Sequence, residues 1–272
     1  MTAVRDARAD ETSELGRLLA RAGFGPTVGG LVTFPRESPD GDVLVAERGG
    51  RAVGGVCCAS FGTTGWIGAL GVVPEARRRG VGLALAEAAC DRLRERGAQT
   101  VLLFATDMGH PLYARMGFEV EGRATAWRGT AGRPPAGIGL RALRDSDRPV
   151  IATIDAQATG ERRHPVLDAL RPLSGLMAER GDEPLGFAVT SPWGAGVAIC
   201  ATDPDAGVAL LSSAAGGPGP TTMVVPAENA GAARELRRWG FTSADAGARM
   251  RLGPAVAWRP ELQFGLFNLF WG

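Results

Sequence analysis

The chain has 272 residues, enough for one large or two ordinary domains, and 45% of them are hydrophobic, which suffices for a sizeable core. Its 30 basic residues, all of them arginine, balance 29 acidic ones, and a net charge of +1 disfavours nucleic acid or a membrane surface as a partner. The first residues lack the apolar stretch of a signal peptide, and no apolar run is long enough to span a membrane. We therefore expect a cytoplasmic protein.

The cysteines give no sign of a disulfide framework or a metal centre. Cys57, Cys58, Cys90 and Cys200 form no C-x-x-C pair, and the two histidines lie far from them in the sequence. We expect buried free thiols in a reducing compartment and no bound metal.

The first predicted elements are strands. Asp42–Arg48 and Arg51–Phe61 flank Gly49 and Gly50, a pattern typical of a β-hairpin. An apolar run over Gly68–Val73 then ends at Pro74, which predicts a buried strand.

A helix and two further strands follow. Gly80–Arg96 carries apolar residues at helical spacing and is followed by Gly97, a residue typical of a helix C-terminus. Thr100–Ala105 predicts a short buried strand, and a short helix then ends at Gly117-Phe118. Glu119–Trp127 predicts one long strand.

The junction between the buried strand and the helix reads Arg77-x-x-Gly80-x-Gly82. Glycines let backbone amides approach an anion closely. The first amides of a helix have no intrahelical partner and point outward. The pattern therefore predicts a site that holds phosphate or pyrophosphate.

The order of these motifs resembles the GNAT superfamily of acyl-CoA N-acyltransferases over roughly residues 40–128. The resemblance rests on V-x-P-x-x-R-x-x-G-x-G, a strand, and then L-Y-x-x-x-G-F, carried here by Val72, Pro74, Arg77, Gly80, Gly82, Leu112, Tyr113, Gly117 and Phe118. It implies an α/β (α+β) fold with a mixed, mostly antiparallel sheet flanked by helices. It also implies acetyl-CoA as the acyl donor substrate.

The resemblance further implies which residues contact the coenzyme. Main-chain amides of the strand would meet the pantetheine, with Val72 facing the thioester oxygen. The loop amides would hold the pyrophosphate, and Arg78 or Arg79 would pair with the 3′-phosphate. The residues expected to contact acetyl-CoA are Leu70, Val72, Arg77, Arg78, Arg79, Gly80, Val81 and Gly82.

Catalysis requires an acid that protonates the leaving thiolate and an acceptor for the amine proton. By resemblance, Tyr113, the single tyrosine of the chain, donates a proton to the thiolate. Some members of the superfamily carry a glutamate at a place that falls at or near Trp66, which cannot serve as a base. His110 is the first candidate for that role, ahead of Asp107 and Glu119. A water relay, or an amine that arrives neutral, would need no dedicated base.

The acceptor pocket is expected where Gly23–Glu37 meets the splayed strands. This segment is mostly apolar, which favours a small or partly apolar amine over a polycation. In the second half, Arg162, Arg163 and His164 would bind a carboxylate if the two halves face each other.

The two halves of the chain are faintly self-similar around a Gly/Pro-rich linker at residues 129–137. Leu176–Arg180 and Pro184–Thr190 predict a second hairpin, and Gly240-Phe241 repeats Gly117-Phe118. The similarity predicts GNAT-like domains over residues 1–128 and 138–272, an arrangement similar to bacterial tandem GNAT proteins.

The second domain is expected to be degenerate. No Arg-x-x-Gly-x-Gly follows its strand Gly196–Ala201, and Leu236 stands at the position that matches Tyr113. The first domain has room for only one strand after Phe118. We therefore expect the tail over residues 256–270 to cross back and complete or cover the first sheet.

The function that these observations favour is transfer of acetyl from acetyl-CoA to a small-molecule amine by direct attack. Two alternatives stay open: a non-catalytic acyl-CoA-binding sensor or scaffold, and a protein N-acetyltransferase. The expected partner is the amine substrate, and a homodimer stays open as well.

Overall fold

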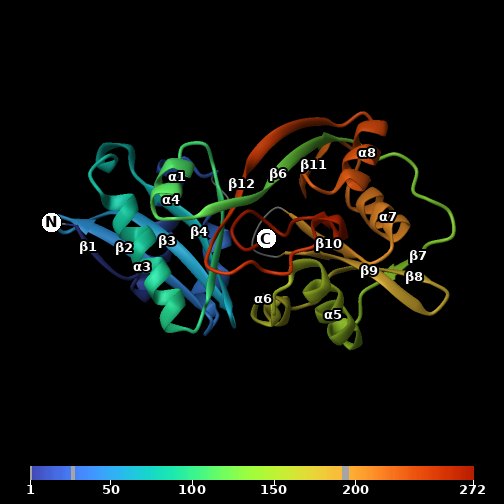
Figure 1. The fold of residues 1–272 in the computed structure, drawn as a ribbon, viewed down its shortest axis with the longest axis horizontal. Helices are drawn as coiled ribbons and strands as arrows, with labels where there is room; N and C mark the ends of the chain where they lie inside the picture. Colours follow the sequence, from blue (N-terminus) through green and yellow to red (C-terminus); the bar gives the residue numbers. More distant parts are fainter. Residues whose placement is uncertain (1, 26–27, 192–195) are drawn as a thin grey trace.

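The computed structural model describes residues 2–25, 28–191 and 196–272, which form two sheets flanked by helices (Figure 1). Within these ranges, the first sheet has eight strands, in the spatial order β1 (Ala3–Asp6), β2 (Gly41–Arg48), β3 (Arg51–Phe61), β4 (Thr64–Val72), β5 (Thr100–Ala105), β12 (Thr242–Leu252), β6 (Glu119–Gly129) and β11 (Thr221–Pro226). The second has five, in the order β13 (Gln263–Gly265), β10 (Val197–Ala201), β9 (Glu183–Thr190), β8 (Gly175–Arg180) and β7 (Gly139–Ala142).

Among the described strands, neighbours pair antiparallel except β4 and β5, which are parallel. The predicted mixed, mostly antiparallel α/β fold is therefore confirmed. Both predicted hairpins form, as β2–β3 and β8–β9.

The α-helices of the described residues are α1 (Thr12–Arg21), α2 (Val28–Glu37), α3 (Val81–Glu95), α4 (His110–Arg115), α5 (Arg148–Thr159), α6 (His164–Ala169), α7 (Pro204–Ala214) and α8 (Ala230–Arg238), with 3₁₀ turns η1 (Ala9–Glu11), η2 (Pro74–Ala76), η3 (Asp145–Asp147) and η4 (Pro260–Leu262).

The helices of the first half lie on opposite faces of the first sheet. A Cβ at Gly65 of β4 would meet Leu93 of α3, whereas one at Gly71 would meet Leu19 of α1. None of the described helices combines the length and the apolar character needed to cross a bilayer.

A strand from the second half completes the first sheet. β12 lies between β5 and β6, and Figure 1 shows β6 and β12 running side by side between the two halves. β11 adds to the outer side of β6. The sequence analysis expected the tail over residues 256–270 to complete or cover the first sheet. The structure places the completing strand one element earlier, whereas the tail does cover the sheet, since a Cβ on Gly68 of β4 would lie 2.6 Å from Cβ of Phe270. The strand that the tail contributes, β13, pairs with β10 of the second sheet.

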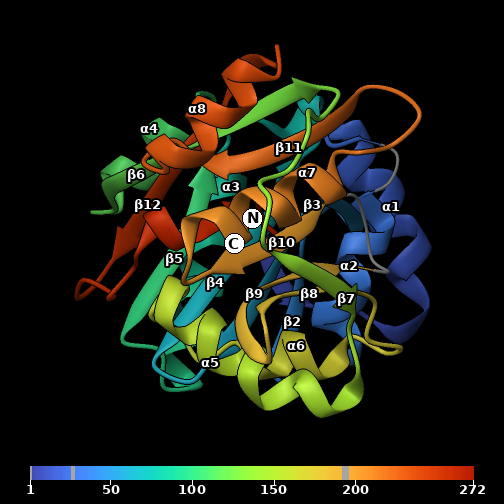
Figure 2. The same cartoon turned by 90° about the vertical axis from the view of Figure 1, so that its right-hand side faces the viewer.

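The hydrophobic core is also shared between the halves. One cluster of buried residues joins Leu85 and Trp66 of the first half to Ile154 and Phe187 of the second. A second cluster packs α7 and α8 against the opposite face of the second sheet. Figure 2 shows α5 and α6 on one side of β8 and β9, with α7 on the other. Because the halves share a sheet and a core, the site on β4 is built from both.

Candidate active site

A bulge in β4 sets the geometry of the site. Gly68 lies opposite Cys57 and Gly71 opposite Gly55, so Ala69 and Leu70 together oppose the single residue Val56. Ala69 adopts φ 49°, a conformation that is uncommon for a residue other than glycine. Such a conformation costs of order 1–3 kcal/mol and persists only where the surrounding structure enforces it.

Beyond the first three residues of β4, the two parallel strands separate. β4 pairs with β5 only from Thr64 to Trp66. Just after β4, the amide of Val73 donates to the carbonyl of Val53 of β3 at 3.0 Å, which makes these two residues a hydrogen-bonded pair. Since hydrogen-bonded and non-bonded pairs alternate along antiparallel strands, the amide of Val72 points away from β3, into the gap beside β5.

The loop after β4 leads to a helix end with free amides. Arg78 and Gly80 adopt positive φ values of 56° and 80°. Gly80 is the N-cap of α3 and contributes no side chain, and the first helical hydrogen bond is donated by Ala84 to its carbonyl. The amides of Val81, Gly82 and Leu83 therefore have no intrahelical partner, which is the arrangement that binds an anion.

The three arginines of the loop have different surroundings. Arg78 and Arg79 are exposed beside the helix end. Arg77 instead donates from Nε to the carbonyl of Val72 at 3.0 Å and from Nη2 to the carbonyl of Ala22 at 2.8 Å. Its side chain thus ties the loop to the end of β4 and to the end of α1.

The glycine loop, the gap in the sheet and α4 lie next to one another. A Cβ on Gly82 would lie 3.7 Å from Leu112, 3.8 Å from Val72 and 4.0 Å from Leu70. The structure thereby brings together predicted coenzyme contacts from β4 and α3 with the helix that carries the tyrosine.

Tyr113 is buried on α4, with its ring 5.5 Å from that of Phe118. Its hydroxyl makes no hydrogen bond to the described residues, and burial, with a smaller effect from nearby Cys90, raises its pKa above the usual 10. A phenol in this state is protonated at neutral pH and available as a donor.

Within the described part of the chain, none of the three candidate bases forms a hydrogen bond with Tyr113. His110 is half-buried and is the first residue of α4, one turn before Tyr113. Asp107 is exposed in the preceding loop, and Glu119 pairs with Arg251 at 2.9 Å.

Where the superfamily can carry a glutamate, the structure supplies a carboxylate from the second half. Trp66 donates from Nε1 to Glu161 at 2.9 Å, and Thr64 donates to the same oxygen at 2.8 Å. Arg249 of β12 lies between the rings of Trp66 and Trp258, 4.9 and 4.5 Å from their centroids. The sequence reasoning did not include Glu161 and Arg249 in the site, because no local pattern links them to β4.

The second half closes the equivalent helix end. Asp203 is the N-cap of α7, and its carboxylate accepts hydrogen bonds from the amides of Asp205 and Ala206. It also pairs with Arg180 at 2.9 Å. The protein's own carboxylate thus occupies the place that an anion would take, and at the tyrosine position Leu236 is buried.

Of the three basic residues expected to bind a carboxylate in the second half, Arg163 binds one within the protein. Arg163 is 3% exposed and pairs with Asp155 at 2.5 Å. Its Nη1 also donates to the carbonyls of Trp271 and Gly272, at 3.0 and 2.7 Å. Arg162 and His164 are exposed.

A bulged β4 that separates from β5 and leads into an uncapped helix end defines the fold of acetyl-CoA-dependent acyltransferases of the GNAT type. The profile described as "Acetyltransferase (GNAT) family" matches residues 16–118, and the one described as "Acetyltransferase (GNAT) domain" matches residues 151–265. The chain belongs to the GNAT acetyltransferases and carries two GNAT domains in tandem.

Solved structures share this tandem fold. A Pyrococcus horikoshii protein described as an acetyltransferase aligns with a TM-score of 0.84 at 23% identity, over 100% of this chain and 96% of its own. A GCN5-related N-acetyltransferase from Sphaerobacter thermophilus aligns with a TM-score of 0.65 at 19% identity, over 94% of this chain and 98% of its own. A tandem GNAT protein from the clavulanic acid biosynthesis pathway aligns with a TM-score of 0.61 at 16% identity, over 94% of this chain and 100% of its own. No curated protein sequence matches the chain.

Proposed function

We propose that the protein is an N-acetyltransferase that moves the acetyl group of acetyl-CoA to the amine of a small molecule. The reaction would take place in the first domain, and the second domain would bind no coenzyme. The observation that carries the proposal is the contrast between the two helix ends. The end of α3 is uncapped beside a gap in the sheet, whereas Asp203 caps the end of α7.

In the proposed reaction, free amides at the start of α3 hold the pyrophosphate and the gap between β4 and β5 holds the pantetheine. The amide of Val72 donates a hydrogen bond to the thioester oxygen, where negative charge develops during attack. This placement aligns donor and acceptor before reaction, which supplies much of the rate enhancement in such transfers.

The amine nitrogen attacks the carbonyl carbon, and the carbon–sulfur bond breaks. Tyr113 gives its proton to the departing thiolate, so that CoA leaves as the thiol. The amine loses one proton to His110 or to water, and solvent restores the proton of Tyr113. The products are the acetylated amine and CoA.

The test follows release of free thiol from acetyl-CoA against a panel of amines, with calorimetry of acetyl-CoA binding alongside. We expect Tyr113→Phe to lower kcat by about 10²-fold or more while the Kd for acetyl-CoA is unchanged. Absence of acetyl-CoA binding by the folded protein refutes the proposal. Binding without turnover across the panel instead indicates an acyl-CoA-binding sensor or scaffold.

A further inference from the structure

Two phenylalanines, one from each half of the chain, cover the bulge of β4. A Cβ on Gly68 would lie 2.6 Å from Cβ of Phe270, and a Cβ on Gly71 would lie 3.1 Å from the ring of Phe24. The two rings meet edge to face, with centroids 5.7 Å apart. Both residues are half-buried.

These rings lie on the face of the sheet opposite the proposed coenzyme site. Gly71 faces Leu19 of α1 and Ala22 just after it, whereas Val72 and Leu70 lie near Gly82 of α3. A nucleophile attacks a thioester from above or below the plane of its carbonyl. Since the coenzyme would occupy the α3 side, the amine has to reach the gap from the α1 side, past Phe24 and Phe270.

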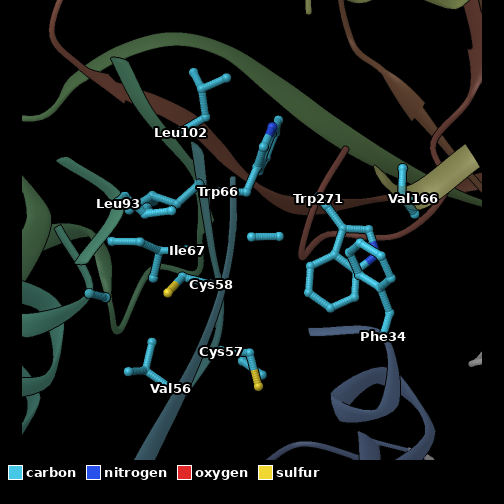
Figure 3. Close-up of a cluster of buried hydrophobic side chains, with 14 of the residues drawn as sticks. Phe34, Val56, Cys57, Cys58, Trp66, Ile67, Leu93, Leu102, Val166 and Trp271 are labelled. Carbon is cyan, nitrogen blue, oxygen red and sulfur yellow. The ribbon is translucent and has the colours of Figure 1, made fainter. Parts of the chain in front are cut away.

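The second half holds Phe270 in place. Asn268 accepts hydrogen bonds from the amides of Phe270 and Trp271, at 2.7 and 3.0 Å. Arg163 binds the carbonyl of Trp271, as described above. The ring of Trp271 lies 5.3 Å from that of Phe34, and Figure 3 shows this pair between Trp66 and Val166 of α6.

Carbon atoms lie nearest to the bulge on this face. The atoms nearest to Gly68 and Gly71 belong to Phe270, Phe24, Leu19 and Ala22. The nearby charged groups of Glu161 and Arg249 are buried against Trp66, farther back along β4. Beside these two glycines, an acceptor on this face would therefore meet mainly rings and aliphatic carbon.

We propose that Phe24 and Phe270 form the wall of the acceptor site, and that the acceptor is a primary amine with an aromatic or similarly flat apolar group. This inference rests on the proposed function. It also assigns a substrate-recognition role to the C-terminal tail, and hence to the second half.

The test uses the full chain saturated with CoA and measures binding of phenethylamine by calorimetry, with spermidine and glucosamine as polar comparison amines. We expect phenethylamine to bind more tightly than either. We expect Phe24→Ala and Phe270→Ala each to weaken its binding about 10- to 100-fold, as loss of an aromatic anchor does. Phe270→Leu should restore part of this affinity, because it keeps apolar bulk over Gly68.

Two controls separate this inference from the proposed function and from misfolding. Leu269→Ala, next to Phe270 in the tail, should leave phenethylamine binding unchanged. The Kd for CoA should be the same in all variants, and loss of CoA binding by the wild-type chain refutes the proposed function itself. Two results with CoA bound would refute the proposed wall. One is equal affinity of wild type, Phe24→Ala and Phe270→Leu for phenethylamine. The other is tighter binding of spermidine or glucosamine than of phenethylamine.

Discussion

The free amides at the start of α3 can be tested by placing a charge among them. Gly80 is the N-cap of α3, and a Cβ there would meet nothing within 4 Å, so a short side chain fits without a clash. We therefore expect Gly80→Asp to fold and to repel the coenzyme. Gly80→Asn is the matched control, because it has the same shape and the same strain at φ 80° but carries no charge.

The size of the effect follows from Coulomb's law. An aspartate here would lie about 6 Å from a phosphate held at the helix end, and one pair of unit charges at that distance interacts by about 0.7–2.8 kcal/mol for an effective dielectric constant between 80 and 20. Gly80→Asp should therefore bind acetyl-CoA about 3- to 100-fold more weakly than Gly80→Asn.

Calorimetry at two salt concentrations measures this difference. Because salt screens exposed charges, the gap between the two variants should narrow between about 0.05 and 0.5 M salt. Thermal unfolding of both variants checks that they are equally folded. Equal affinity of the aspartate and asparagine variants at low salt would refute the placement of the diphosphate at α3.

Further predictions concern the buried polar groups. Burial raises the pKa of Tyr113 above 10, so kcat should not fall below pH 10 through ionisation of this acid. A fall in kcat near pH 8 that is absent in Tyr113→Phe would contradict this. Arg163→Ala leaves Asp155 as a buried unpaired charge and should lower the free energy of unfolding, measured in urea, by about 3–5 kcal/mol. A loss of less than about 1 kcal/mol would show that the pair is unimportant for stability. Burial raises the pKa of Glu161 above its ordinary 4.5, so its contribution to stability is full below pH 4.5 and is lost as pH rises through the folded-state pKa. Glu161→Gln, which keeps an oxygen for Trp66, should flatten the fall in stability that begins above pH 4.5, and parallel stability curves for the two proteins would count against it.

Local patterns in the sequence were enough to predict most helices and strands of the first half. The hairpin around Gly49 and the strand Thr100–Ala105 form as predicted, and α3 spans Val81–Glu95 within the predicted Gly80–Arg96. These elements depend on alternation, helical spacing and turn residues, all of which are read from neighbours in the chain.

The features that could not be predicted depend on partners far away in the sequence. Ala69 gives no glycine signal for its positive φ, because the bulge is enforced by packing against β3. Arg77 matches the motif, but its bond to Ala22 joins residues 55 positions apart. Glu161 reaches Trp66 across 95 positions. The predicted acceptor segment Gly23–Glu37 supplies Phe24 and Phe34, while residues 26–27 lie outside the described part of the chain.

The position of β12 has a consequence for how the chain is made. During synthesis the amino-terminal domain emerges first, yet its sheet cannot close until Leu252 has left the ribosome. Until then β5 and β6 expose unpaired edges that can join strands of other chains. Separating the two halves genetically would make that exposure permanent.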